Sequence, residues 1–274
     1  MIRFIGIDID GTLLDSSGHM PEANRTAIHR AVAAGVHVAL VTGRSYPFAR
    51  PVANDLPSSI SLIVSNGAVE RATDGSTLAR RLLDRHVARD VLDVTRHCRD
   101  AAALIFDRDE DRQVVYESMD WDHPGRERYW SRNHSRIAQS VPLEAALTED
   151  PIQVMFNGSV EEMRVLRDGL LRRARRCTVQ MTEYQSRDFS LVDVTSQQAT
   201  KGLAVAWRAE QLGLTRDEVM AVGDNFNDRE MLEFAGTAVL MGNAVDGLRT
   251  PGWHVTGHQD ECGVAQAIER FVLA

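Results

Sequence analysis

Short apolar runs alternate with amphipathic stretches in the first third of this chain. Arg3–Asp8 is apolar on successive residues, which is typical of a parallel strand that is buried on both faces. Pro21–Ala34 has apolar residues at helical spacing, begins with Pro and is followed by Gly35, so it predicts a helix. The same alternation continues through Val36–Val41, Pro47–Asp55 and Ser61–Val64. Strands that alternate with helices predict a parallel sheet with right-handed crossovers.

The middle of the chain follows a different pattern. Two predicted helices, Leu82–Cys98 and Val160–Ala174, are interspersed irregularly with predicted strands at Ala103–Phe106, Val114–Glu117, Ile152–Asn157, Thr178–Glu183 and Phe189–Val194. The aromatic and polar stretch Met119–Arg136 has no clear period. We interpret residues 82–187 as an α+β unit that is inserted into a larger domain.

The last third returns to the first pattern, with predicted elements at Thr200–Leu212, Val219–Val222, Asp228–Phe234, Ala238–Met241 and Val264–Val272. The sequence therefore predicts an α/β fold. Its core is a Rossmann-like, doubly wound parallel sheet built from residues 1–81 and 188–274.

Composition narrows the class of protein. Of 274 residues, 43% are hydrophobic and 26% charged, and no apolar run is long enough to span a membrane. The start, MIRFIGIDID, turns acidic too early for a signal peptide. A net charge of -8 argues against a nucleic-acid partner. The three cysteines, Cys98, Cys177 and Cys262, have no metal or disulfide spacing, so we expect reduced thiols and a cytoplasmic location.

Carboxylates follow two of the predicted strands. Asp8 and Asp10 come at the end of the first strand, and Asp224 and Asp228 follow the strand Val219–Val222. Ligands of open α/β sheets bind at these carboxyl ends, and carboxylates that are close together repel each other unless a cation or a proton lies between them. Asp228 could alternatively serve only as the cap of the following helix. Together, these carboxylates would form an acidic, oxygen-rich pocket, which suits Mg²⁺.

Two further features point to phosphate. The segment Thr42-Gly43-Arg44 follows a predicted strand and offers a hydroxyl and backbone N–H groups, although alone it could be an ordinary turn. Lys201 is the one lysine among 31 basic residues, so a compact ammonium has been kept where a guanidinium would not serve. Beside Asp8, that ammonium would offset carboxylate repulsion and neutralise a bound phosphate.

Together these motifs resemble those of the haloacid dehalogenase-like (HAD) phosphatases, specifically the Cof-type branch with a type IIB α/β cap. The resemblance rests on DIDGT, the Thr42-Gly43-Arg44 segment, Lys201 and GDNFND, in that order. The segments Ser65-Asn66-Gly67-Ala68, Met241-Gly242-Asn243-Ala244 and Glu261-Cys262-Gly263-Val264 also look like this branch. The stretch before Lys201 lacks the Pro and Gly that are often seen there, which leaves the geometry of that loop open.

The resemblance implies catalytic and metal-binding roles. Asp8 would be the nucleophile that attacks phosphorus, and Asp10 would protonate the leaving oxygen and then activate water. Mg²⁺ would be held by Asp8, the backbone carbonyl of Asp10 and Asp224. Asp228 would support the metal or Lys201.

It also implies residues that bind phosphate. Thr42 and Lys201 would bind the transferring phosphoryl group, and Gly43 would add a backbone N–H. Asn66 and Asn227 are candidate contacts to the substrate or its phosphate.

The implied function is hydrolysis of a small phosphorylated metabolite by a monomer or homodimer, with the inserted cap selecting the substrate. Sugar phosphates are favoured over pyridoxal phosphate or nucleotides. Two alternatives stay open at this point: a phosphomutase of the phosphomannomutase kind, and a catalytically silent phosphate-binding protein.

Overall fold

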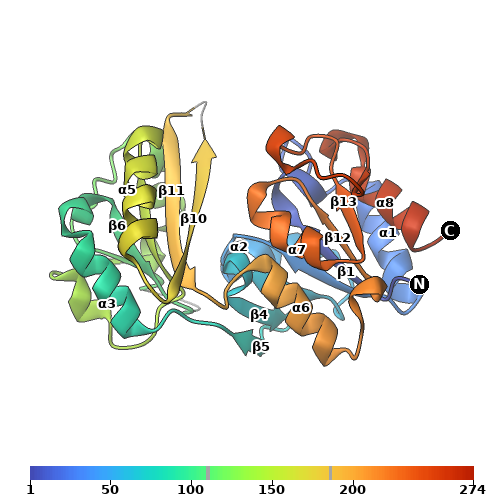
Figure 1. Ribbon diagram of the computed structural model, residues 1–274, viewed down its shortest axis with the longest axis horizontal. Coiled ribbons are helices and arrows are strands. Elements are labelled where there is room, and N and C mark those ends of the chain that lie inside the picture. The colour runs from blue at the N-terminus through green and yellow to red at the C-terminus, as the bar shows by residue number, and fades with distance from the viewer. Residues whose placement is uncertain (109–111, 185–186) are drawn as a thin grey trace. The chain divides into compact units, whose positions relative to one another are not determined.

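The computed structural model describes residues 1–108, 112–184 and 187–274. The chain divides into two compact units, whose helices and strands are drawn in Figure 1. Residues 1–80 and 198–274 form the first unit, and residues 81–197 form the second. None of the helices in these described ranges is long and apolar enough to cross a membrane.

The first unit is built on an eight-stranded sheet in the order β14-β13-β12-β1-β2-β3-β4-β5. All strands from β14 to β3 are parallel, and β4 and β5 add an antiparallel hairpin. The strands are β1 (Phe4–Asp8), β2 (His37–Val41), β3 (Ser61–Val64), β4 (Val69–Ala72), β5 (Thr77–Arg80), β12 (Val219–Gly223), β13 (Thr237–Leu240) and β14 (His254–Val255). This sheet confirms the predicted doubly wound α/β fold.

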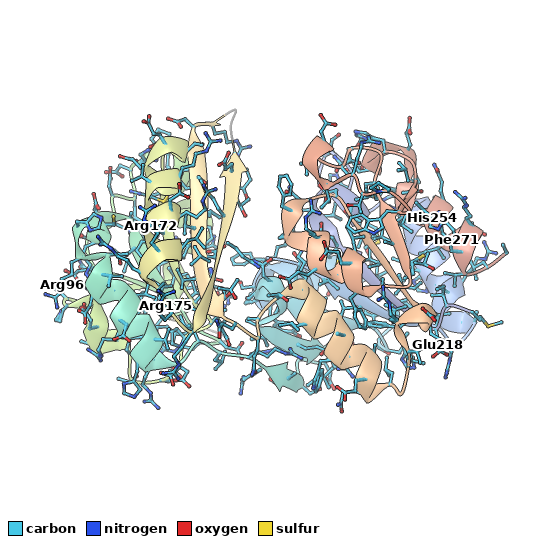
Figure 2. All side chains as sticks on the ribbon, viewed as in Figure 1. Arg96, Arg172, Arg175, Glu218, His254 and Phe271 are labelled. Atoms are coloured by element: carbon cyan, nitrogen blue, oxygen red, sulfur yellow. The ribbon has the colours of Figure 1, made fainter. Side chains whose placement is uncertain are left out.

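Helices cover both faces of this sheet. Helices α1 and α8 pack together, as do α6 and α7, and Figure 1 shows the two pairs on opposite sides. The helices are α1 (Glu22–Ala33), α2 (Tyr46–Ala49), α6 (Lys201–Gln211), α7 (Arg229–Phe234) and α8 (Gly263–Phe271). The edge strand β14, which the sequence analysis missed, is held against α8 by ring contact between His254 and Phe271, with centroids 4.6 Å apart (Figure 2).

The second unit has a six-stranded sheet in the order β10-β11-β9-β6-β7-β8. Its apolar core lies between this sheet and two helices, α3 (Arg85–Val94) and α5 (Val160–Arg173). Asp84 caps α3, and Ser159 with Glu162 forms a capping box on α5. The strands are β6 (Ala102–Ile105), β7 (Val114–Tyr116), β8 (Ile137–Gln139), β9 (Gln153–Gly158), β10 (Cys177–Tyr184) and β11 (Phe189–Ser196).

Two features of the second unit differ from the sequence-based expectations. Strand β11 pairs with both β9 and β10, so the unit extends to Gln197, whereas our predicted boundary of 187 falls before β11. The aperiodic stretch 119–136 contains helix α4 (Pro124–Asn133). Trp130 of this helix packs on Trp121, which precedes the helix, with ring centroids 5.1 Å apart.

Asp193 on β11 gives the second unit a pH-dependent stability. Only 8% of Asp193 is exposed, and burial raises the pKa of this carboxyl to about 7, although Gln153 Nε2 donates to its Oδ1 at 2.8 Å. The pKa of Asp193 is higher in the folded chain than in the unfolded chain. Between about pH 4 and pH 7 the folded chain therefore keeps a proton that the unfolded chain has released. The contribution of Asp193 is therefore fully present below about pH 4 and is lost as the pH rises to about 7.

We expect Asp193→Asn to remove this dependence and to raise the free energy of unfolding at pH 8 by roughly 3 kcal/mol relative to wild type. Urea denaturation at a series of pH values measures the effect, with Asp168→Asn on the exposed face of α5 as the matched control. Parallel stability curves for wild type and Asp193→Asn would contradict the assignment.

Candidate active site

The centre of the site is a buried triad of two carboxylates and one ammonium. Asp8 ends β1 and Lys201 begins α6, and Lys201 Nζ donates to Asp8 Oδ1 and Asp228 Oδ1, each at 2.6 Å. The exposed fractions are 4% for Asp8, 1% for Lys201 and 0% for Asp228. A lysine buried this deeply is held by its partners, so its position and charge are fixed.

Asp224 joins this group from the end of β12. Its Oδ1 accepts a hydrogen bond from Thr12 Oγ1 at 3.0 Å. The other oxygen of Asp228, Oδ2, accepts from the backbone N–H groups of Asp224 and Asn225, each at 3.0 Å. Gly11 has φ +82°, and an added Cβ there would lie 2.4 Å from Asp224 Oδ2, so this turn requires glycine.

The site has an excess of negative charge. Burial, and then Asp228, raise the pKa of Asp8 well above its ordinary value, and the same two causes raise the pKa of Asp224 to about 6. Although burial opposes it, attraction to Asp228 and Asp8 raises the pKa of Lys201. One ammonium therefore faces three carboxylates, of which one oxygen each lies within 4.8 Å of the others. This arrangement could hold a metal ion, because a divalent cation would relieve the repulsion that shifts both aspartates.

Asp10 lies apart from the buried carboxylates. Its side chain is 58% exposed, and both its oxygens accept hydrogen bonds from Arg44, at 2.8 Å from Nε and 2.5 Å from Nη2. The sequence analysis gave Arg44 no role of its own.

The predicted phosphate-binding residues lie on the neighbouring strand ends. Val41 pairs with Asp8, so the next residue, Thr42, follows at the same edge of the sheet and is 1% exposed. An added Cβ at Gly43 would be 3.2 Å from Asn66 Oδ1, and Asn227 Nδ2 donates to that oxygen at 3.3 Å. The side chains of Asn66 and Asn227 are thus brought together.

The turn that contains Asn66 also positions α6. Residues Ser65, Asn66 and Gly67 have φ of +51°, +53° and +96°, a left-handed run. An added Cβ at Gly67 would lie 2.3 Å from the carbonyl oxygen of Thr200, so α6 starts in close contact with this turn. Thr200 caps α6, because its Oγ1 accepts a hydrogen bond from Leu203 N at 3.1 Å.

Asn243 and Thr12 are supporting residues that sequence reasoning missed. Asn243 Nδ2 donates to the carbonyl oxygen of Gly11 at 2.7 Å, and Asn243 Oδ1 accepts from Gln259 N at 2.9 Å. Both residues stand in motifs that carry the family resemblance, which was the available signal.

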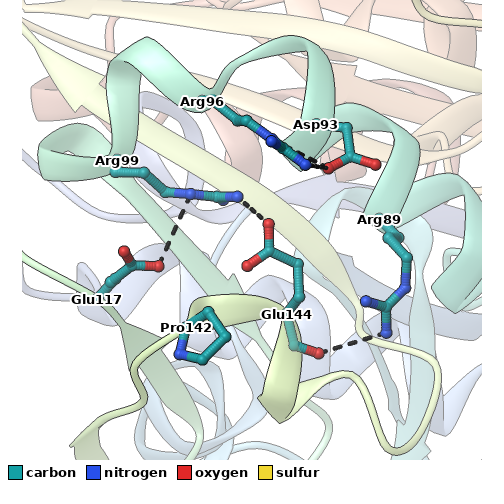
Figure 3. A pocket seen from close by; sticks show the side chains of 7 residues that line it. All are labelled: Arg89, Asp93, Arg96, Arg99, Glu117, Pro142 and Glu144. Carbon is teal, nitrogen blue, oxygen red and sulfur yellow. Dashed lines mark hydrogen bonds and ion pairs between the residues drawn. The ribbon is translucent and has the colours of Figure 1, made fainter.

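A separate pocket of about 620 Å³ lies in the second unit (Figure 3). Five of its six charged side chains pair with one another: Arg99 contacts Glu144 and, at 3.7 Å, Glu117, and Arg96 Nη2 lies 2.8 Å from Asp93 Oδ1. Arg89 Nη2 donates to the backbone carbonyl oxygen of Glu144 at 3.4 Å. The pocket is lined by Arg89, Asp93, Arg96, Arg99, Glu117, Pro142 and Glu144. It contains none of the predicted site residues.

The structure also places three other arginines of this unit. Arg126 Nη2 donates to the carbonyl oxygen of Asn157 at 2.9 Å, which ties α4 to β9. Arg172 and Arg175 are exposed, on and after the last turn of α5 (Figure 2). The side chains of Arg128 and Arg132 lie outside the described part of the chain.

Comparison with known proteins places these residues in a family. The family described as haloacid dehalogenase-like hydrolase matches residues 5–268. The chain is 27% identical over 274 residues to the 5-amino-6-(5-phospho-D-ribitylamino)uracil phosphatase YcsE of Bacillus subtilis, covering 99% of this chain and 96% of that protein. It is 29% identical over 275 residues to the HMP-PP phosphatase of Serratia proteamaculans, with coverage of 99% and 96%.

A solved structure of the HAD subclass IIB sugar phosphatase BT4131 has the same fold. The TM-score is 0.78 at 20% sequence identity, over 99% of this chain and 100% of that one.

Proposed function

The chain belongs to the haloacid dehalogenase-like hydrolase family and is a phosphatase enzyme, and from this premise we propose that it hydrolyses a small phosphorylated metabolite through an aspartyl-phosphate on Asp8. The observation that carries the proposal is the buried contact of Lys201 with Asp8 and Asp228 beside Asp224. Phosphoryl transfer depends on positioning and charge neutralisation, which is what this arrangement provides.

The chemistry has two steps. A carboxylate oxygen of Asp8 attacks phosphorus, and the bond from phosphorus to the leaving oxygen breaks as that oxygen takes a proton from Asp10. A water molecule then attacks phosphorus and gives a proton to Asp10, and the bond to Asp8 breaks, which regenerates its carboxylate and releases inorganic phosphate. Lys201 would neutralise charge on the phosphoryl oxygens, and Thr42, Gly43, Asn66 and Asn227 would orient them.

Magnesium is the proposed cofactor. Asp8, Asp224 and the backbone carbonyl of Asp10 would hold it, and Asp228 would support this set through Lys201 and the backbone N–H of Asp224. When bound, the ion would neutralise the phosphate and the buried carboxylates, whose pKa values are raised first by burial and then by repulsion from Asp228.

We propose a sugar phosphate as the substrate class and residues 81–197 as the cap that selects it. Support comes from the names of the relatives, one of which acts on a phosphoribityl compound and another of which is a sugar phosphatase. We further propose that the enzyme acts in the cytoplasm as a monomer or homodimer.

The test is phosphate release from p-nitrophenyl phosphate and a panel of sugar phosphates, pyridoxal phosphate and nucleotides, in Mg²⁺ and in EDTA. We expect release that falls at least about 100-fold in EDTA and recovers when Mg²⁺ is restored. Full activity in EDTA would exclude the cofactor. Conversion of one sugar phosphate to another without release would favour a phosphomutase, and no reaction of either kind would favour a phosphate-binding protein.

A further inference from the structure

Arg44 binds Asp10, the residue to which the proposed mechanism assigns both proton transfers. We propose that Arg44 is a positioning residue that holds the carboxylate of Asp10 in the orientation that hydrolysis of the aspartyl-phosphate requires. This inference rests on the proposed function and assigns it an additional residue.

The guanidinium of Arg44 forms a bidentate contact, or fork, with the carboxylate of Asp10. Nε and Nη2 of Arg44 each bind a different oxygen of Asp10, so the orientation of the carboxylate plane is fixed. Arg44 is itself anchored, since its Nη1 donates to the carbonyl oxygen of Phe48 at 3.4 Å and its backbone N to Thr42 Oγ1 at 3.1 Å. Hydrogen bonding to Asp10 raises the pKa of the guanidinium, which stays charged. Arg44, which follows β2, thus places a permanently charged guanidinium against Asp10.

The contact matters most for the second step. In that step an oxygen of Asp10 must lie against the attacking water, and a carboxylate that is bound through both oxygens keeps its orientation. In the first step Asp10 gives a proton to the leaving oxygen, and a leaving group that departs without a proton does not depend on this orientation.

The pair lies at a more exposed position than the buried triad. The side chains of Asp10 and Arg44 are 58% and 31% exposed, whereas that of Lys201 is 1% exposed. Ion pairs open to solvent contribute little net stability, so the contact of Arg44 with Asp10 serves the orientation of the carboxylate and not the stability of the fold. The structure therefore combines one buried, fixed ion pair at the nucleophile with one accessible pair at the proton-transfer residue.

The test separates the two steps by rapid acid quench with p-nitrophenyl phosphate in Mg²⁺. This leaving group departs without a proton, so formation of the phosphoenzyme should change less than about twofold in Arg44→Ala. Hydrolysis of the phosphoenzyme should slow about tenfold, so that the phosphorylated fraction rises in the steady state. Arg44→Lys, which keeps the charge but not the fork, should recover part of the loss.

A double-mutant cycle tests whether Arg44 acts through Asp10. In the background of Asp10→Asn, Arg44→Ala should slow phosphoenzyme hydrolysis no further, because the residue that it positions is already inactive. The control is Arg30→Ala, which removes another exposed arginine–carboxylate pair, with Glu269, and should leave both steps unchanged.

The outcomes also distinguish the inference from the proposed function. Equal slowing of both steps in Arg44→Ala, or a tenfold loss that persists in Asp10→Asn, would overturn the positioning role while the phosphatase mechanism stands. A wild-type enzyme that releases phosphate without forming a phosphoenzyme on Asp8 would overturn both. If Arg44→Ala does not fold, the same comparison is made with Arg44→Lys, for which unchanged phosphoenzyme hydrolysis would overturn the role.

Discussion

Replacing Asp8 by Asn should reduce phosphate release by about 10⁴-fold or more, the largest effect expected in this protein. The amide cannot act as the anionic nucleophile, so no acyl phosphate can form. Because the amide oxygen introduced by this substitution can still accept a hydrogen bond from Lys201 Nζ, as the carboxylate of Asp8 does, the fold should be retained. Phosphate release, together with acid-quench detection of protein-bound phosphate, measures both parts of this expectation.

Asp15→Asn is the matched control, since it makes the same chemical change seven residues further along, at a partly exposed position that accepts from the backbone N–H groups of Ser17 and His19. It should keep activity within about twofold, as expected for a surface substitution. Substantial turnover by Asp8→Asn, with phosphate still found on the protein, would place the nucleophile elsewhere.

Lys201→Met should lower both activity and stability. The variant leaves Asp8 and Asp228 buried without the ammonium that lies 2.6 Å from each. Loss of one partner from a buried ionic network costs about 3–5 kcal/mol, so the free energy of unfolding in EDTA should fall by that amount. Turnover should fall about 10³-fold, since the phosphoryl oxygens lose their fixed cation. Urea denaturation and phosphate release measure these effects.

A second substitution identifies the cause of the instability. Lys201→Met/Asp228→Asn removes one carboxylate with the ammonium, so it should recover part of the stability that the single variant loses. Addition of Mg²⁺ should stabilise Lys201→Met, because a ligand that binds only the native state shifts the folding equilibrium. If the double variant were less stable than the single one, the loss would arise from packing around the side chain and not from uncompensated charge.

Local sequence pattern determined most of the secondary structure, since it encodes period and burial. The apolar runs at β1, β2, β3 and β12 have both faces buried, so each was readable without knowledge of its neighbours. Strands β8 and β14 were missed because they span three and two residues and are held by their contacts. Likewise, β11 reads as a strand in sequence, but only its pairing with β9 and β10 assigns it to the inserted unit.

The sequence by itself singled out Asp8, Asp224 and Lys201 as candidate site residues, because carboxylates at strand ends and a single lysine among arginines are visible without coordinates. Their meeting was decided by tertiary structure: the order β12-β1-β2 brings the strand ends together, and α6 delivers Lys201 across a separation of 193 residues. Tertiary structure alone also paired Arg44 with Asp10. A sequence records which residues carry charge, whereas the partner of each charge depends on distances that arise only when the strands assemble.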